Sequence, residues 1–485
     1  MSEIKNKILS GLFWKYSEIV CNHGVGFIIS VVLARMLTPD DYGVLSLLNI
    51  FIAIANTIVV SGFGSALIQK KDADNKDYST VLYFSIIMSV IAYIILFFAA
   101  PSIAKFYHMP SITAAFRVLA STLIIGAINS VQRAYVQKHM QFKSFFFSTI
   151  IGTVTSGIAG IYMAYHGFGV WALVAQHLIS RITDTVVLCF TVKWKPQWTF
   201  SFKRLNKLFG FGWKVLCSTC LNTLYRNMYS LIIGKCYSTA DLAYYNRGSG
   251  WPDSIITNID GTMNSVLYPA FSKVQDDKKM FKLMMRRSIT LSTYLIFPAM
   301  MGLAAIAKPL TVVVLTEKWL PSVPFVQFCC FTYALMPIHT ANLQAMMGAG
   351  RSDLLFKLEI IKKIYGITIL AITLPLGLYA MMIGKCVGGI IGAFVNASPN
   401  KKLFDYSFIE QLKDILPSVL LSCGMGAAVW LLSLLNINLY LLIAIQVVAG
   451  VTLYFLMSYI FKIEPFFYLL RNAKSLFNKV IKKQG

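Results

Sequence analysis

Charged side chains inside long apolar runs are the residues of this sequence with the potential for chemistry. Lys15 and Glu18 lie in the stretch GLFWKYSEIV (Gly11–Val20), and Lys214 follows Trp213 at the start of a later apolar run. A charge held within a membrane is costly and marks a functional site by default, whereas a lysine beside a tryptophan can extend to the lipid headgroups. Both interpretations stay open until the other embedded charges are considered.

The charges embedded in the apolar runs are mostly cationic. They are the cations Lys15, Arg117, Arg181, Lys214, Arg226, Arg247 and Lys385, and the anions Glu18, Asp184, Asp253 and Asp260. An unpaired surplus must face water or an anionic ligand. Guanidinium groups offer forked donors to phosphate oxygens, so such a surplus suits a pyrophosphate headgroup, whereas a pocket for cationic drugs would be acidic. The charge balance therefore predicts an anionic substrate.

Lys15 begins a polar stripe on its predicted helix. The stripe is spaced at i, i+3, i+7 and i+11 and consists of Lys15, Glu18, Asn22 and Gly26. This spacing places all four on one helical face, which must point into a helix bundle rather than at lipid. Glu18 lies one turn from Lys15 and can neutralise it, so the pair is a candidate for gating or ion coupling as well as for phosphate binding.

Three other embedded cations differ in the role that their surroundings predict. Arg181 and Asp184 are three residues apart and are expected to form a structural pair. Arg226 lies just beyond the middle of its run, too deep for its guanidinium to reach the headgroups. Arg247 precedes GSGWPD (Gly248–Asp253), whose glycines and proline favour a distorted backbone where a helix lines a cavity.

The remaining embedded charges fill two further roles. Lys385 and Arg117 follow as candidates for the cationic cavity, although the glycines around Lys385 also suit close helix packing. Asp253 and Asp260 join Glu18 as candidates for ion coupling or gating. Transport would then be coupled to a proton or sodium gradient, or driven by the membrane potential acting on an anionic substrate.

The composition indicates that membrane-spanning helices position these charges. Of the 485 residues, 57% are hydrophobic and 13% are charged, whereas soluble domains carry about a quarter charged residues. The net charge of +24 falls in short gaps between apolar runs, which favours membrane orientation over nucleic-acid binding. No P-loop, zinc-ligand spacing or nucleophile motif is found, and Cys217 and Cys220 fall inside a predicted helix. We therefore expect no catalytic residue, cofactor or metal.

Fourteen apolar runs approach the length of about 20 residues that a membrane-spanning helix needs. They cover residues 9–36, 42–67, 79–100, 112–133, 145–165, 169–192, 207–234, 241–270, 284–307, 322–347, 354–374, 377–397, 412–435 and 438–461. The predicted fold is an all-α polytopic membrane protein of about 14 transmembrane helices.

Positively charged loops orient these helices. With the N-terminus in the cytoplasm, most of the 44 lysines and arginines fall in loops on the cytoplasmic side. The lysines in loops on the other side are Lys105, Lys235, Lys308 and Lys318. Because cytoplasmic loops are enriched in Lys and Arg, both chain ends are predicted to be cytoplasmic and the number of spans even. The basic tail from Glu464 onward is amphipathic and is expected to lie along the inner leaflet.

An internal repeat is indicated by matching residues in the two halves. Trp14-Lys15 recurs as Trp213-Lys214, and Leu37–Gly43 matches Tyr237–Ala243 in residue type after a one-residue slip. Transporters are commonly built from related lobes with a site between them. We expect an N-terminal lobe of spans 1–6 in residues 1–200, a C-terminal lobe of spans 7–12 in residues 201–402, and spans 13–14 with the basic cytoplasmic tail in residues 403–485.

Four stretches resemble a known family. They are LARMLTPDDYGVLSL (Leu33–Leu47), AYYNRGSGWPDSI (Ala243–Ile255), VLYPAFSKVQDD (Val266–Asp277) and MMGAGRSDLLFK (Met346–Lys357). The sequence resembles, along essentially its whole length, the bacterial polysaccharide flippases, which are the O-antigen and exopolysaccharide exporters of the multidrug/oligosaccharidyl-lipid/polysaccharide superfamily. The resemblance implies two six-helix lobes around a central cavity that opens alternately to either side. Cavities of this family are typically cationic, a pattern that Lys15, Lys214 and Arg247 fit.

We hypothesise a transporter rather than an enzyme. The resemblance implies that the protein flips an undecaprenyl-pyrophosphate-linked oligosaccharide from the inner to the outer leaflet of the bacterial plasma membrane, for surface polysaccharide biosynthesis. Arg226, Arg247 and Lys214 are the first candidates to bind the pyrophosphate, followed by Lys15. The expected partners are the lipid-linked oligosaccharide, membrane lipids and polysaccharide polymerase machinery, with no nucleic acid.

Three alternatives remain. A flippase for the peptidoglycan precursor would have the same design. A multidrug exporter of the same superfamily would be better suited by twelve spans and an acidic pocket. An integral-membrane glycosyltransferase would need an acid/base pair on an external surface, where the short loops offer only Asp40 and Asp41 in a tight turn.

Overall fold

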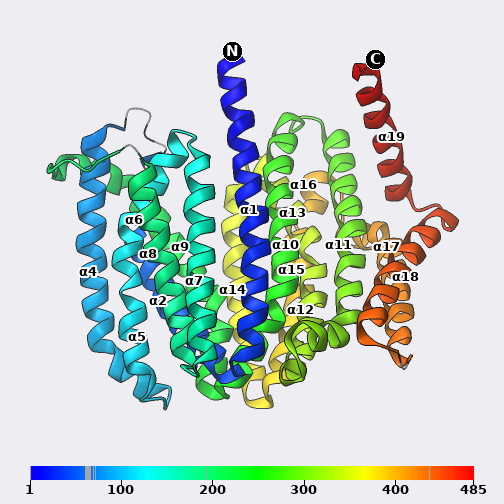
Figure 1. The fold of residues 1–485 in the computed structure, drawn as a ribbon. Helices are drawn as coiled ribbons and strands as arrows, with labels where there is room; N and C mark the ends of the chain where they lie inside the picture. Colours follow the sequence, from blue (N-terminus) through cyan, green and yellow to red (C-terminus); the bar gives the residue numbers. More distant parts are fainter. Residues whose placement is uncertain are drawn as a thin grey trace. The chain divides into compact units, whose positions relative to one another are not determined.

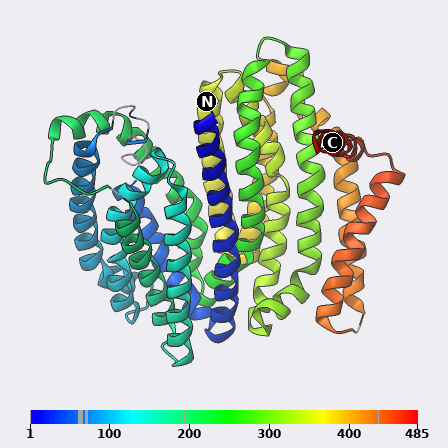
Figure 2. The same cartoon turned by 45° about the horizontal axis from the view of Figure 1, so that its top comes forward.

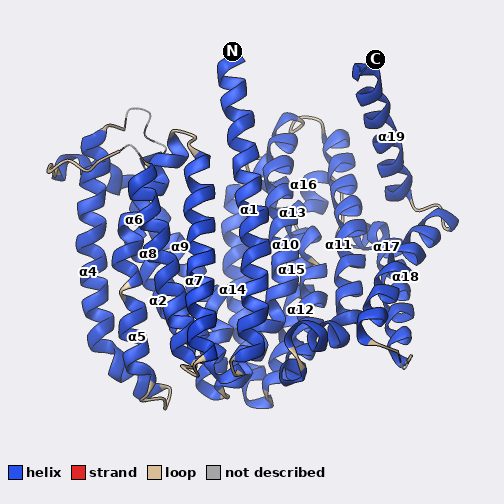
Figure 3. Ribbon diagram, viewed as in Figure 1, coloured by secondary structure: helices blue, strands red, loops and turns tan. Residues whose placement is uncertain are grey.

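The computed structural model describes residues 2–60, 67–68, 70, 73–192, 194–435 and 437–484. Within the helices, the side chains of residues 2–9, 207–212, 214–215, 473 and 476–484 lie outside this description. Throughout the described part, regular secondary structure is helical, as Figure 3 shows. The prediction of an all-α protein is confirmed.

The chain divides into two compact units, residues 1–243 and 244–485. In each unit long helices run side by side as a bundle (Figures 1 and 2). The helices of the first unit are α1 (Ser2–Met36), α2 (Pro39–Val60), α4 (Asn75–Phe106), α5 (Ile112–Ala120), α6 (Thr122–Lys138), α7 (Phe142–Tyr165), α8 (Val170–Thr191) and α9 (Phe202–Cys236).

The second unit contains most of α10 (Thr239–Lys273) and the helices that follow it. These are α11 (Lys278–Leu315), α12 (Val323–Ala334), α13 (Met336–Gly348), α14 (Ser352–Thr373), α15 (Leu378–Ala397), α16 (Asn400–Phe404), α17 (Phe408–Leu431), α18 (Leu439–Ile460) and α19 (Glu464–Gln484). Short 3-10 turns, Glu317–Ser322, Leu374–Leu376 and Leu432–Leu434, join some of these helices.

Among the described residues, fewer helices than the predicted fourteen have the length and composition of a membrane span. The predicted runs are helical over most of their described residues, but those described residues contain 11 helices that are both long and apolar enough to cross a membrane. The helices that fail are α9, α10 and α14, of 35, 35 and 22 residues. They are long enough, and it is their polar and charged side chains that lower their hydropathy. The count of fourteen is therefore not confirmed, and the three exceptions are polar helices.

Glycines on α7 allow three helices of the first unit to pack closely. A Cβ built on Gly152 or Gly160 would lie 3.2 Å from atoms of α8, and one built on Gly157 would lie 2.2 Å from Ile29 Cδ1 of α1. Small residues let the backbones of membrane helices approach one another. The helix α7 is thus packed against both α1 and α8, and it faces the polar stripe of α1.

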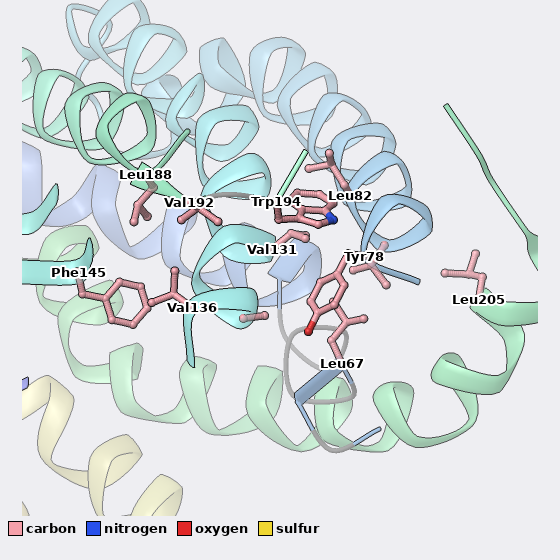
Figure 4. Packing of buried hydrophobic residues seen from close by; sticks show 12 residues of the cluster. Leu67, Tyr78, Leu82, Val131, Val136, Phe145, Leu188, Val192, Trp194 and Leu205 are labelled. Atoms are coloured by element: carbon pink, nitrogen blue, oxygen red, sulfur yellow. The ribbon is translucent and has the colours of Figure 1, made fainter. Parts of the chain in front are cut away.

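An apolar cluster anchors the segment between α8 and α9. Trp194 from this segment packs with Tyr78 of α4, whose ring centroid lies 5.8 Å away, and with Val131 of α6 (Figure 4). Phe145 of α7 extends the same cluster. The connection to α9 is therefore tied to the N-terminal end of α4.

Ion pairs reinforce this end of α4. Arg204 of α9 contacts Asp74 at 2.5 Å and Asp77 at 3.1 Å, and Lys70 contacts Asp77 at 2.5 Å. Asp74 is the N-cap of α4, and its hydrogen bond from Arg204 lowers the pKa of its carboxyl to about 2. The starts of α4 and α9 are thus held together.

In the second unit α10 stays helical through GSGWPD, where the sequence predicted a distorted backbone. A Cβ built on Gly248 would lie 2.6 Å from Phe325 Cβ of α12, so the glycine serves close helix packing. Further along, Phe271 of α10 stacks on Phe281 of α11, which stacks on Phe404 of α16, with centroids 5.0 and 4.2 Å apart. These contacts hold α10 in the bundle on one side.

The starts of α2 and α10 have the same hydrogen bonds. The Thr38 hydroxyl donates to Asp41 at 2.7 Å, and the Ser238 hydroxyl donates to Asp241 at 2.7 Å. The amides of Asp41 and Asp241 donate back to these hydroxyls at 3.3 and 3.0 Å. This reciprocal cap at both helix starts supports the internal repeat inferred from the sequence.

Candidate functional site

The polar stripe of α1 lies against α7. Lys15 Nζ contacts Glu18 Oε2 at 2.5 Å, and the other oxygen of Glu18 accepts a hydrogen bond from Thr149 at 3.3 Å. One turn further, Thr153 donates to Asn22 Oδ1 at 2.6 Å. Glu18 is buried, whereas the Lys15 side chain is 40% exposed. The stripe faces a neighbouring helix of the bundle, as its spacing predicted, and the Lys15 charge is balanced locally.

Asp184, predicted to pair with Arg181, pairs with Arg133. Asp184 Oδ2 accepts from Arg133 of α6 at 2.7 Å and from Asn129 of the same helix at 3.0 Å. Arg181 is exposed on α8 while Asp184 is buried, and the two interact electrostatically with no hydrogen bond or ion pair between them. Sequence reasoning did not count Arg133 among the embedded charges because it is the last residue of the predicted run 112–133, although its spacing of i, i+4 from Asn129 was a usable signal.

The structure describes the contacts of the Arg117 side chain but not those of Lys214. Arg117 Nε donates to the Phe97 carbonyl of α4 at 3.2 Å, and the guanidinium lies 4.1 Å from the Phe97 ring centroid. These contacts hold Arg117 against α4, which favours a structural role over ligand binding. The Lys214 side chain lies outside the described residues, although the helix that carries it is described.

Arg226 lies on an exposed polar face of α9. This face carries Ser218, Asn222 and Arg226 at i, i+4 and i+8, and all three are exposed. An adjoining side of α9 meets α2, where the hydroxyls of Thr223 and Thr57 are 3.4 Å apart. Among the described residues, no side chain forms an ion pair or hydrogen bond with the Arg226 guanidinium. An arginine in this position needs water or an anion beside it.

Arg247 and Lys385 lie beside aromatic rings in the second unit. The Arg247 guanidinium is 5.5 Å from the Trp319 ring centroid, and Trp319 is fully buried. Lys385 Nζ donates to the Tyr245 hydroxyl at 3.0 Å. Lys385 and Asp253 both lie close enough to Tyr333 to act on it electrostatically. The Trp319 ring and the Tyr245 hydroxyl help to orient these two cations and carry no charge themselves.

Asp260 belongs to a polar ladder between α10 and α13. Its carboxylate accepts from Thr340 and, at 3.1 Å, from Asn264 of its own helix. Asn264 in turn accepts from Gln344 at 2.6 Å. Both helices contribute residues at i and i+4, so the two pairs form successive rungs. Asp260 is therefore bonded between two helices of the second unit.

One face of α10 was missed by sequence reasoning. Ser254, Asn258, Thr262 and Ser265 are all exposed, in a run that was assigned to the membrane. Their spacing of i, i+4, i+8 and i+11 was visible in the sequence and marks one helical face. These residues are small and uncharged, whereas the residues predicted to bind the substrate are cations.

An apolar groove lies between α11, α17 and α18. Its volume is about 370 Å³. Its lining includes Pro298, Gly302, Leu303, Val429, Val447 and Gly450. The groove has the chemistry of a site for a hydrocarbon chain.

Comparison with known protein families assigns this chain to one of them. A profile described as polysaccharide biosynthesis protein matches residues 32–324. The chain belongs to this family. Its members are Wzx-like flippases of the MOP superfamily, so this member is a membrane transporter of polysaccharide biosynthesis and not an enzyme.

Curated relatives of this family member are similar along most of their length. The teichuronic acid biosynthesis protein TuaB of Bacillus subtilis is 23% identical over 465 residues, which is 94% of this chain and 95% of TuaB. The lipopolysaccharide biosynthesis protein WzxC of Escherichia coli is 21% identical over 86% of this chain and 83% of its own. The succinoglycan biosynthesis transport protein ExoT of Rhizobium meliloti is 20% identical over 72% and 71%.

Solved structures show the fold of this family member. The lipid II flippase MurJ in an inward closed conformation superposes with a TM-score of 0.72 at 14% identity, covering 93% of this chain and 98% of MurJ. An inward-facing multidrug resistance MATE transporter superposes with a TM-score of 0.58 at 15% identity, covering 79% and 96%. The chain therefore has the MurJ/MATE-like fold of a multi-pass bacterial membrane protein.

Proposed function

We propose that this protein flips an undecaprenyl-pyrophosphate-linked oligosaccharide from the inner to the outer leaflet of the plasma membrane by alternating access. The observation that carries the proposal is Arg226, an exposed arginine on a polar face of α9 to which no described residue is bonded. A cation in such a place suits an anionic headgroup, and a guanidinium can bind phosphate oxygens with two donors. The family supplies the context of polysaccharide transport.

The three polar helices complete the proposed set of spans. With α9, α10 and α14 added to the 11 apolar helices, the chain crosses the membrane fourteen times and both ends are cytoplasmic. Polar faces on α9 and α10 are tolerated at membrane depth where they border water. The low hydropathy of α9 and α10 is then a consequence of lining a transport path. The lobes proposed for residues 1–200 and 201–402, with residues 403–485 appended, follow from the same repeat.

The pyrophosphate ligands are proposed in an order that the contacts support. Arg226 comes first, followed by Arg247, whose guanidinium is oriented by Trp319. Lys214 lies on the same helix as Arg226 and is kept as a candidate. Lys15 is balanced by Glu18 and is proposed as half of a gating pair.

The acidic residues are proposed to act in coupling to different degrees. Glu18 is buried and pairs with a lysine that is partly exposed, so its protonation would release the Lys15 charge. Asp253 lies near Lys385 and Tyr333 and is a second candidate. Asp260 is engaged in the ladder with Thr340, so its proposed role is to hold α10 against α13.

The apolar groove offers a place for the prenyl chain. It lies between α11, α17 and α18 and is lined almost entirely by hydrocarbon. A polyprenyl chain buried there gains free energy from apolar contact, about 0.8 kcal/mol per buried CH₂ relative to water. The pyrophosphate headgroup can then move along a polar path while the prenyl chain stays in the apolar groove.

Complementation tests the proposal directly. In a strain from which the gene is deleted, Arg226→Ala should reduce surface polysaccharide about tenfold or more at unchanged protein level, because a charge-assisted hydrogen bond to phosphate contributes about 1.5 to 3 kcal/mol. Arg351→Ala removes an exposed arginine that pairs with Asp353 two residues away, and it should export normally. Normal export by Arg226→Ala would contradict the cationic site.

The lipid that accumulates in the deletion strain identifies the cargo. We expect an undecaprenyl-pyrophosphate-linked oligosaccharide of a surface polysaccharide on the inner leaflet, measured by mass spectrometry of extracted lipids. Accumulation of the peptidoglycan precursor would assign the protein to that pathway in its place.

A further inference from the structure

A face of α10 is polar without carrying charge. It consists of Ser254, Asn258, Thr262 and Ser265, all exposed, and is called the polar strip below. At about 1.5 Å per residue, the strip is about 16 Å long. A helix that places hydroxyl and amide groups on its exposed side borders water or a polar ligand, because such groups are costly against hydrocarbon.

The space beside the strip is open, whereas other sides of α10 contact neighbouring helices. Gly250 and Gly261 lie on the same side of the helix, and a Cβ built on either meets no atom within 4 Å. Elsewhere around the helix, Asp260 bonds to Thr340 of α13, and Gly248 lies against α12. The helix is thus held by its other faces, and a ligand could reach the polar strip.

The hydrogen bonds of the strip leave acceptor groups available. Each of its four side chains donates to a carbonyl of its own helix, at donor–acceptor distances of 2.7 to 3.0 Å. A hydroxyl oxygen retains lone pairs after donating, and an asparagine retains its carbonyl oxygen. The strip therefore offers a row of uncharged acceptors held in place by the helix. A ligand rich in hydroxyl donors matches this row.

Arg247 lies in line with the strip. Arg247, Ser254, Asn258 and Ser265 are spaced at i, i+7, i+11 and i+18, which places them along one line of α10. A guanidinium thus stands at one end of an uncharged polar row. A saccharide joined to a pyrophosphate has the same order of groups, with a charged end followed by a neutral chain of hydroxyls.

We propose that the polar strip binds the oligosaccharide part of the cargo through hydrogen bonds to sugar hydroxyls. This inference rests on the proposed flippase function and adds the residues that contact sugar. Direct and water-mediated bonds both serve, because a bridging water is nearly as favourable as a direct bond. The cations hold the pyrophosphate, and the strip distinguishes a lipid that carries sugars from one that does not.

Two lipid probes separate these roles. The full-length protein in nanodiscs is titrated with sugar-free undecaprenyl pyrophosphate and with the lipid-linked oligosaccharide extracted from the deletion strain. The triple variant Ser254→Ala, Asn258→Ala, Thr262→Val should bind the glycolipid about tenfold more weakly and the sugar-free lipid as well as the wild type, because about three modest hydrogen bonds are lost. Arg226→Ala should weaken the binding of both lipids.

Matched variants control for folding. Thr368 of α14 is exposed and donates to its own helix at 3.0 Å, as Thr262 does, but it lies among exposed isoleucines such as Ile364 and Ile367. Thr368→Val should leave the affinity for both lipids unchanged. The conservative pair Asn258→Gln, Thr262→Ser keeps polar groups in place and should retain most of the preference for the glycolipid.

Other outcomes overturn the inference. If the triple variant binds the glycolipid like the wild type, or loses affinity for both lipids equally, the strip does not contact sugar. If the wild type binds neither lipid, the proposed function fails and the inference falls with it. If the wild type binds both lipids with equal affinity, the cationic site stands and the sugar contact is refuted.

Discussion

Glu18 is a carboxylate with a bond to each of its oxygens. One oxygen contacts Lys15 at 2.5 Å, and the other accepts from Thr149 of α7 at 3.3 Å. Protonating the carboxyl would weaken both bonds at once, since a neutral acid attracts an ammonium far less. The loss would reach α7 through Thr149 and free the Lys15 side chain. A single proton can therefore change both a charge and a helix contact.

At the residue scale, the Arg133–Asp184 bond makes a prediction about stability. Asp184→Asn should lower the thermal stability of the detergent-solubilised protein by on the order of 2 kcal/mol, because it leaves the Arg133 guanidinium without its anionic partner at 2.7 Å. Arg181→Ala is the matched control, and a thermal melt should show little change. Equal losses for the two variants would indicate that Arg181 shares the bond.

Individual contacts explain which parts of the site the sequence could predict. The stripe of Lys15 and Glu18 was predictable because it is local, with a spacing that defines one face. The partner of Asp184 was not, because Arg133 is distant in the chain and an arginine one turn away offered a local choice. The polar strip of α10 was visible as a spacing, but its uncharged residues resemble the small residues of ordinary helix contacts.

At the element scale, Gly157 of α7 permits a close contact between α1 and α7. Gly157 faces Ile29 so closely that an added Cβ would lie 2.2 Å from Ile29 Cδ1. The same contact brings Asn22 within 2.6 Å of Thr153.

Helix prediction from the sequence succeeded along these elements because apolar runs define helices well. The predicted count of fourteen spans is not confirmed, because the polar and charged side chains of α9, α10 and α14 keep these helices out of the 11 that are apolar enough to span.

Gly157→Val should push α1 away from α7 and destabilise the protein by about 1 to 3 kcal/mol, as overpacking does elsewhere. The second substitution Ile29→Ala provides space and should restore part of the loss. A thermal melt of the single and double variants measures this coupling. Additive losses in the double variant would show that the two residues do not meet.

At the scale of the whole molecule, the distribution of charge predicts the orientation of the chain in the membrane. Lysines and arginines are abundant in or directly beside the connections of α2 to α4, α8 to α9 and α10 to α11, where Lys273, Lys278 and Lys279 lie at the helix ends, and they are rare at the alternate connections. Positive segments remain on the cytoplasmic side of bacterial membranes. The polar helices α9 and α10 obey the same alternation, which supports counting them among the spans.

Reporter fusions test this orientation. Alkaline phosphatase fused after residue 238, between α9 and α10, should be active because the fusion point is external, whereas fusions after residues 196 and 276 should be inactive. Green fluorescent protein at the same positions should give the opposite pattern. If α9 does not cross the membrane, the fusions after residues 196 and 238 would behave alike.

The paired caps at the starts of α2 and α10 also bear on the ancestry of the chain. Thr239 beside the second cap donates to Asp40 at 2.5 Å, so the two duplicated corners touch. In a symmetric dimer of two identical ancestral halves, this bond would occur twice. The matching positions here are Pro39 and Ala240, which cannot form the second bond. After fusion of the halves into one chain, the residues of one of the two equivalent contacts could change while the other contact was kept.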